Sequence, residues 1–230
     1  MAPHPEQTLT LHYHPWEPAA QALRLALGLK GVARTDHRLP YNELATFYRL
    51  GQPCRTPLLE GPDGRAEHLG WDDLPGLDER FGARHAPAPE PDAWGALRNW
   101  LDQVLPLLAR LAAPVGYAWR GLGDDTDARA AHAREARRRF GLSLEALAND
   151  RYAAYGQLAA LSRLPALGAH LARQGWYLGR PSLADAVLAS ALFPLQLLDG
   201  IALPIHLLYY LRRVQDEAGV DLEADLLISL

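Results

Sequence analysis

His12 and His14 stand two residues apart at the end of an apparent β-strand, a spacing that could present both imidazoles on one face as metal ligands. A protein zinc site needs at least three protein ligands, and no third ligand follows at a recognisable spacing. We therefore predict no metal site and expect two ordinary structural histidines.

Cys54 is the only cysteine of the chain and precedes Pro57 by three residues. One thiol excludes an internal disulfide, a dithiol redox motif and a thiolate zinc cluster, and it favours a reducing compartment. Cys54 could be an oxidisable thiol near a ligand groove, but a lone cysteine is more often a buried structural residue.

The overall charge gives no reason to expect a nucleic-acid partner. The chain has 230 residues, is 49% hydrophobic and carries a formal net charge of -4. The one dense basic run, Arg134 with Arg137–Arg139, lies next to Glu135 in an alanine-rich stretch without interleaved aromatic residues. We interpret it as the solvated face of a helix.

The sequence pattern also argues against a membrane span. The most apolar region, residues 186–211, is interrupted by proline and by polar residues, so it does not reach the ~20 apolar residues that a spanning helix needs. The first residues, MAPHPEQTLTLHYH, lack the basic and apolar segments of a secretory signal. We expect a cytoplasmic protein with no membrane partner.

Residues 8–82 mix strand and helix signals in the order βαβαββα. Alternation of apolar and polar residues predicts a strand over 8–13, and Pro18 and Gly31 suit the two ends of the helix that follows. The further predicted elements are a weaker strand over Val32–Leu39, a helix over Tyr41–Leu50, a hairpin of Pro57–Glu60 with Ala66–Trp71, and a short helix capped by Asp73 that ends at Phe81.

Three prolines within residues 86–91 predict a stiff linker, and everything after them is helical in pattern. A long helix is expected over Asp92–Ala113, followed by helices at about 127–150, 152–175, 182–195 and 204–218. The predicted domains are therefore residues 1–85, the linker 86–91, and an all-helical domain over residues 92–230.

Ser182 and Asp185 form the sharpest local motif. Their spacing predicts a capping box at the start of a helix, with Asp in place of the commoner Glu. The helix that follows is apolar on nearly every side, so we expect it at the centre of its domain.

The combined order of elements resembles the cytosolic glutathione transferase superfamily. The similarity includes residues 13–28, Thr56-Pro57 before the third strand, the proline linker, and the buried helix opened by residues 181–185. It implies a fold class of α/β plus all-α, with a thioredoxin-like N-terminal domain and a helical C-terminal domain. It also implies a cis Pro57, and a Thr56 whose backbone binds the cysteinyl part of glutathione.

The resemblance implies that Tyr13 stabilises the glutathione thiolate, because Tyr13 aligns with the family's tyrosine position. Between residues 11 and 34 the chain has no Ser, Thr or Cys that could serve the family's other mechanisms. A phenol could donate a hydrogen bond to the sulfur and so lower the thiol pKa from about 8.5. The alternative is that Tyr13 simply packs beneath the first helix.

One departure from the family concerns the γ-glutamyl group of glutathione. The family binds this group with an acidic or amide residue followed by Ser at the start of the third helix. The chain has Trp71, Asp72 and Asp73 in the corresponding stretch. One of the aspartates could accept a hydrogen bond from the ligand ammonium group, or both could be only a helix cap and a surface charge. Arg49 and Arg55 are the candidates for binding the glycyl carboxylate, because both precede Thr56 closely.

Trp16, Tyr117 and Trp119 fall in expected loops where the family places its second-substrate pocket. They could line an apolar cleft or be ordinary packing residues. The resemblance further implies a homodimer, glutathione as co-substrate and a small electrophilic partner.

Two functions remain open from the sequence. The first is a glutathione transferase of the tyrosine type. The second is a non-catalytic ligand-binding or dimeric scaffold with a degenerate glutathione site, which the missing acidic-Ser pair favours. A glutaredoxin-like reductase is excluded on this sequence, because it requires a cysteine in the first turn.

Overall fold

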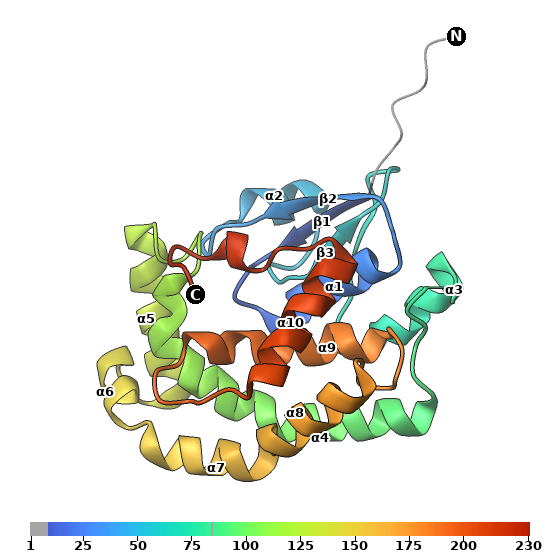
Figure 1. The fold of residues 1–230 in the computed structure, drawn as a ribbon. Helices are drawn as coiled ribbons and strands as arrows, with labels where there is room; N and C mark the ends of the chain where they lie inside the picture. The colour runs from blue at the N-terminus through green and yellow to red at the C-terminus, as the bar shows by residue number, and fades with distance from the viewer. Residues whose placement is uncertain (1–8, 84) are drawn as a thin grey trace.

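A four-stranded mixed sheet forms the first part of the computed structural model, which describes residues 9–83 and 85–230 (Figure 1). The strands are β1 (Leu9–Tyr13), β2 (Arg34–Arg38), β3 (Leu58–Glu60) and β4 (Ala66–His68), in the spatial order β2-β1-β3-β4. β1 pairs in parallel with β2 and antiparallel with β3, and β3 pairs antiparallel with β4. This is the thioredoxin-like arrangement that the order βαβαββα predicts.

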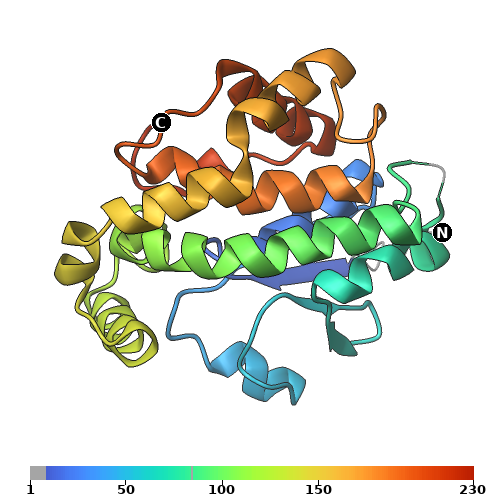
Figure 2. The ribbon, with the colours of Figure 1, turned by 90° about the horizontal axis from the view of Figure 1, so that it is seen from below.

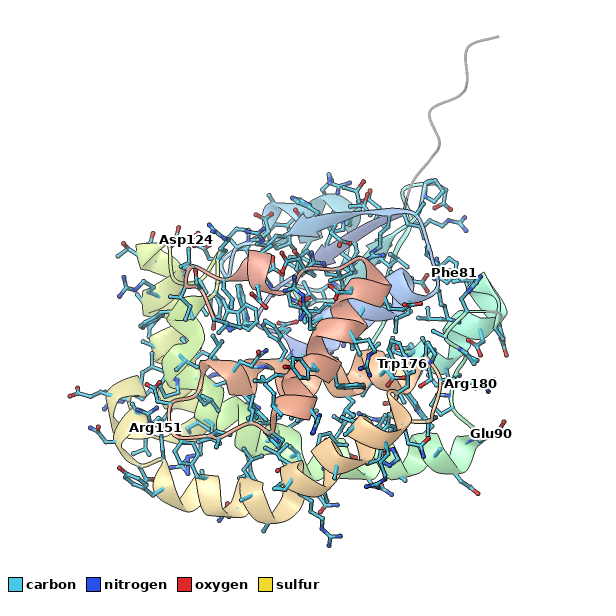
Figure 3. The ribbon with its side chains drawn as sticks, in the orientation of Figure 1. Phe81, Glu90, Asp124, Arg151, Trp176 and Arg180 are labelled. Atoms are coloured by element: carbon cyan, nitrogen blue, oxygen red, sulfur yellow. The ribbon has the colours of Figure 1, made fainter. Side chains whose placement is uncertain are left out.

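Helices make up the rest of the chain. With the sheet lie α1 (Pro18–Leu29), α2 (Ala45–Leu50), the 3₁₀ helix η1 (Trp71–Gly76) and α3 (Leu77–Phe81). The helical part contains α4 (Pro91–Ala112), η2 (Ala113–Ala118), α5 (Thr126–Phe140), α6 (Leu144–Asn149), α7 (Tyr152–Ser162), α8 (Leu164–Gln174), α9 (Leu183–Leu192), η3 (Phe193–Leu197), α10 (Ile205–Ala218) and η4 (Glu223–Asp225). Figure 3 marks Phe81 and Glu90, the ends of the segment that joins α3 to α4.

Two predicted helices are each divided in the structure. The helix expected over about 127–150 ends at Gly141, which has a φ of 72° in the left-handed region, and Ser143 caps a new helix. The helix expected over 152–175 breaks at Arg163, whose φ of 47° is uncommon for a residue with a side chain. Pro165 follows in the first turn of α8, where a proline is tolerated but cannot continue the previous helix.

Helix α1 lies between the sheet and the helical part of the chain. It packs on one face against η1 and on another against α9 and α10 (Figure 1). Seen from below, α4 runs beside α9 and α7 (Figure 2). Every residue of α9 is buried, as its apolar pattern predicts. Within the part of the chain that the structure describes, no helix is long and apolar enough to cross a membrane.

Candidate active site at the start of helix α1

The turn between β1 and α1 carries the group of side chains best placed for chemistry. β1 ends at Tyr13, and the backbone N–H of Glu17 donates to the carbonyl of His14 at 3.2 Å. Pro18 occupies the first turn of α1, where it needs no hydrogen bond from its nitrogen. The first-turn N–H groups of a helix have no partner within the helix, so they face this turn with partial positive charge.

Thr56 joins this turn to the start of β3. Its hydroxyl oxygen accepts a hydrogen bond from the N–H of His14 at 3.2 Å, and the hydroxyl donates to Glu17 Oε2 at 2.5 Å. The Thr56-Pro57 bond is cis, as the resemblance implies, and Pro57 is buried. Thr56 thus lies against the residues that open α1, although the two segments are 39 positions apart.

Glu17 is a candidate functional group that sequence reasoning missed. Burial raises the pKa of the Glu17 carboxyl to about 7, and the hydrogen bond from Thr56 opposes this rise only in part. Among the residues that the structure describes, no Lys or Arg forms an ion pair with Glu17. The Glu17 side chain is partly exposed. A carboxyl whose pKa lies near neutrality and that has no cationic partner is typical of functional sites. In the sequence Glu17 stands directly before the predicted helix, and no motif there marks a functional carboxyl.

A row of partly buried aromatic side chains leads from this turn to α5. The ring of His14 stacks on Trp16 with the centroids 4.7 Å apart, and Trp16 contacts Tyr41 at 5.5 Å. Tyr41 and Tyr117 each meet the ring of His132 edge-on at 5.9 Å. This aromatic row, His14, Trp16, Tyr41, His132 and Tyr117, brings together two of the three aromatic residues predicted for a second-substrate pocket.

Trp119, the third of those residues, lies elsewhere. It is 3% exposed and packs against Phe193 with the ring centroids 5.9 Å apart. Its backbone also pairs with Leu226 in an isolated antiparallel bridge. Trp119 is therefore a core residue, and the alternative of ordinary packing holds for it.

Tyr13 does not reach this turn with its hydroxyl. Leu11 and Tyr13 share the face of β1 that packs on α1, because alternate residues of a strand point to the same side. Tyr13 is 2% exposed, and its hydroxyl donates a hydrogen bond to Asp225 at 3.0 Å. Burial raises the pKa of the Tyr13 phenol to about 12. In this structure Tyr13 packs beneath the first helix with its hydroxyl bonded to Asp225, and its contact with a thiol stays a prediction.

The carboxylate of Asp225 is fully buried and collects donors from the first part of the chain. Arg24 approaches it at 2.7 Å and Arg38 at 3.0 Å, while Gln21 donates to it at 3.1 Å. The guanidinium of Arg24 also lies over the Tyr13 ring, 4.8 Å from its centroid. These bonds attach the C-terminal segment to β1 and α1. Sequence reasoning did not detect them, since no local pattern marks a contact across so much of the chain.

The two aspartates predicted to read a ligand ammonium group already have partners. Asp72 lies 3.0 Å from the guanidinium of Arg98, and Asp73 accepts a hydrogen bond from the N–H of Gly70 at 2.7 Å. Asp73 is thus a cap of η1, which is one of the alternatives left open. Trp71 is partly buried and packs on the main core. None of the three shares a described hydrogen bond with the turn at Glu17.

The two arginines near Thr56 differ in whether their guanidinium groups form ion pairs with the described residues. Arg49 forms a two-pronged pair with Glu60, with both nitrogen–oxygen distances at 2.9 Å. Arg55 is exposed and forms no ion pair with any residue that the structure describes. Arg55 therefore remains the candidate for binding a carboxylate beside Thr56, whereas Arg49 is occupied.

His12 and His14 do not converge on a common point. His12 Nδ1 lies 2.9 Å from His37 and its Nε2 lies 2.7 Å from Glu60, while His14 Nδ1–H donates to the carbonyl of Leu39. Within residues 9–83 and 85–230, no cluster of three or more potential metal ligands occurs. The lone Cys54 is exposed, so the expectation of a buried cysteine is wrong.

The fold matches solved structures of glutathione-dependent proteins. Glutaredoxin 2 from Salmonella typhimurium, solved in complex with glutathione, superposes with a TM-score of 0.70 and 19% identity, over 96% of this chain and 99% of that chain. The glutathione transferase GSTFuA2 from Phanerochaete chrysosporium gives a TM-score of 0.70 and 18% identity, over 94% of this chain and 100% of that one.

A third match is a glutathione S-transferase of Ceriporiopsis subvermispora in complex with glutathione, with a TM-score of 0.68 and 14% identity, over 92% of this chain and 96% of that one. No protein-family model matches the sequence, and no curated protein matches it significantly. The chain therefore has the fold of the cytosolic glutathione transferases. Sequence identities of 14–19% support the fold only.

Proposed function

We propose that the chain binds glutathione where the β1–α1 turn meets Thr56, and that it transfers the glutathione thiolate to an electrophilic carbon. The observation that carries this proposal is the link from His14 through Thr56 to Glu17, because it places Thr56, whose backbone N–H and carbonyl have no described backbone partner, beside the start of α1. Structures with the same fold contain glutathione, which supports the choice of ligand.

Thr56 is suited to hold the cysteinyl part of the ligand. Among the described residues, neither its N–H nor its carbonyl has a backbone partner, so both are free to pair with a peptide. An extended peptide that pairs here brings its side chain to the opening of α1. The partial positive charge at the start of α1 favours the thiolate over the thiol.

The aromatic row supplies a surface for the second substrate. Trp16 lies next to Glu17 in the turn, and its ring begins the row that continues to α5. A flat apolar electrophile stacked on such rings would lie within reach of the sulfur. The thiolate then forms the carbon–sulfur bond while a leaving group departs with its electron pair.

The test combines calorimetric titration of glutathione with an assay of its conjugation to a chloronitrobenzene. Wild-type protein should bind and turn over, and Trp16→Ala should raise the KM for the electrophile about tenfold while leaving glutathione affinity nearly unchanged. Trp176→Ala is the matched control, since Trp176 lies in the loop before α9, away from the sheet (Figure 3). Absence of binding heat and of turnover would eliminate the proposal.

A non-catalytic ligand-binding scaffold is the second candidate, and one observation favours it. Both aspartates in the stretch that should read the γ-glutamyl group are engaged, Asp72 by Arg98 and Asp73 by Gly70. Retention of an apolar dye at the aromatic row, without glutathione binding, would select this function. A homodimer and a cytoplasmic location stay predictions from the sequence, and light scattering tests the first of them.

A further inference from the structure

We propose that Glu17 is the general base that removes the proton from the thiol of bound glutathione. This inference rests on the proposed function, and it assigns to Glu17 the chemical step that the resemblance assigned to Tyr13. The position of the Glu17 carboxylate, its hydrogen bonds and the charges around it support this role.

The position of Glu17 is the first argument. It is the residue that precedes α1, and its side chain turns toward Thr56 at the start of β3. A thiol on a peptide paired with Thr56 therefore arrives beside this carboxylate. Tyr13 and Glu17 are only four residues apart, but the phenol enters the core between β1 and α1 while the carboxyl stays partly exposed at the turn.

The hydrogen bonds of Glu17 leave it free to react. The side chain of the residue before a helix can cap that helix, but the Glu17 side chain makes no such bond. Its one described hydrogen bond joins Oε2 to the Thr56 hydroxyl, and Oε1 has no partner among the described residues. Oε1 is thus the acceptor for a thiol proton, and the bond from Thr56 fixes the orientation of the carboxylate.

The groups that surround Glu17 determine its protonation. His14 is neutral at physiological pH, because burial lowers its pKa to about 4. Tyr41 is neutral too, since burial and the nearby Glu135 raise the pKa of its phenol. The cations Arg134 and Arg138 on α5 act on Tyr41, and neither pairs with Glu17.

With no neutralising cation, burial keeps the Glu17 pKa near 7, so a large fraction of the carboxyl is ionised at neutral pH. A general base works best when its pKa lies near the working pH. A free thiol has a pKa of about 8.5, so transfer of its proton to this carboxylate is only slightly uphill. The partial positive charge at the start of α1 lowers the thiol pKa and so brings it closer to the pKa of the Glu17 carboxyl.

The reaction step is a simple proton transfer followed by displacement. The Glu17 carboxylate takes the thiol proton and becomes a neutral acid, and the sulfur keeps the electron pair of the S–H bond. The thiolate then forms a bond to the electrophilic carbon, and the leaving group departs with the electrons of its own bond. Glu17 returns its proton to water or to the leaving group before the next cycle.

The experiment compares the pH dependence of conjugation in wild type and in Glu17→Gln, which keeps the shape and the hydrogen-bonding capacity of the side chain. The wild-type rate should rise with an apparent pKa near 7. In Glu17→Gln the inflection should move toward that of an unassisted thiol, whose pKa is about 8.5, with a rate at pH 7 lower by up to about 15-fold and recovery at high pH. Glu79→Gln, on exposed α3, is the matched control and should behave as wild type.

Two further measurements separate a catalytic role from a structural one. Calorimetry should give Glu17→Gln a glutathione affinity close to that of wild type. Thr56→Val removes the hydrogen bond that lowers the pKa of Glu17, so it should move the wild-type inflection to higher pH. A purely structural Glu17 would not produce this shift.

Each result has one meaning. If wild type binds glutathione and turns over but Glu17→Gln keeps the wild-type rate and pH profile, the inference is overturned while the proposed function stands. If wild type does not bind glutathione at all, both fail. An unshifted inflection in Thr56→Val would also contradict the role assigned to Glu17.

Discussion

The hydroxyl of Tyr13 donates a hydrogen bond to Asp225, which lies 212 positions later in the chain. This bond ties the C-terminal segment to the central strand of the sheet. Leu227 continues the attachment, because its N–H donates to the carbonyl of Ala118 at 2.7 Å. Tyr13, the residue that aligns with a catalytic phenol, therefore contributes to stability at this position.

Replacing Tyr13 tests this assignment directly. Tyr13→Phe removes one hydrogen bond to a buried carboxylate that keeps its other donors, so we expect a loss of about 1–2 kcal/mol in the free energy of unfolding. The conjugation rate should stay within about twofold of wild type. Urea unfolding and the conjugation assay measure the two effects. A large loss of turnover without any loss of stability would return the catalytic role to Tyr13.

Asp225→Asn should cost more than Tyr13→Phe. The substitution leaves the guanidinium of Arg24 without one of its two carboxylate partners in a buried environment, and it removes the partner of Arg38. Removing one member of a buried ion pair is strongly destabilising, so we expect a loss of about 3 kcal/mol in urea unfolding. Asp127→Asn on the exposed face of α5 is the control and should change stability little. Equal stability of the two variants would contradict the role of Asp225.

The stability of Glu17→Gln relative to wild type should depend on pH. Folding raises the pKa of Glu17 from 4.5 to about 7, so the folded chain holds a proton that the unfolded chain releases. The contribution of Glu17 to wild-type stability therefore falls as the pH rises from about 4.5 to about 7 and then levels off. Glutamine does not titrate, so the free energy of unfolding of the variant should rise relative to that of wild type by up to about 3 kcal/mol across this pH window.

The control for this pH series is Glu79→Gln, whose difference from wild type should stay constant with pH. His14, which burial keeps neutral, is present in all three proteins, and its acid-linked loss of stability cancels in the comparison. Urea unfolding from pH 4 to 8 supplies the measurement. A Glu17→Gln curve that runs parallel to wild type would show that Glu17 titrates normally in the folded protein.

Replacing Asp185 should cause the largest loss of stability among the substitutions considered. Its buried carboxylate accepts hydrogen bonds from the N–H groups of Ser182 and Tyr177 and from the hydroxyl of Tyr210. Asp185→Ala leaves these buried donors without an acceptor, so we expect a loss of about 4 kcal/mol or more. Asp125→Ala removes the cap of α5 and should cost only about 1 kcal/mol. Thermal unfolding measures the two losses of stability, and equal losses in Asp185→Ala and Asp125→Ala would contradict this expectation.

The fold was predictable because its signals are local. The alternation that predicted a strand over 8–13, the cap at Ser182 and the all-apolar α9 each depend on residues within a few positions of one another. The cap and α9 are confirmed, and the strand is confirmed over Leu9–Tyr13, residue 8 lying outside the described residues. The divided helices show the limit of such reasoning. Gly141 and Arg163 interrupt segments that have helix-forming residues on both sides, so the sequence pattern predicted one continuous helix where the structure has two.

The candidate site was predictable only in part. Thr56 and Trp16 were predicted from the resemblance; Trp16 lies in the turn before α1, and Thr56 contacts that turn through His14 and Glu17. Glu17 was missed because its unusual pKa comes from burial by the folded chain and not from any sequence neighbour. Tyr13 was assigned by alignment, although the same alternation that predicted β1 also predicts that Tyr13 faces the core with Leu11.

A crystal structure of the protein soaked with glutathione tests the central claim most directly. We expect the ligand backbone to pair with Thr56, with its sulfur beside the Glu17 carboxylate and the start of α1, and with the Tyr13 hydroxyl still bound to Asp225. A ligand sulfur in contact with the Tyr13 hydroxyl, or a groove at Thr56 that stays empty at saturating glutathione, would contradict it.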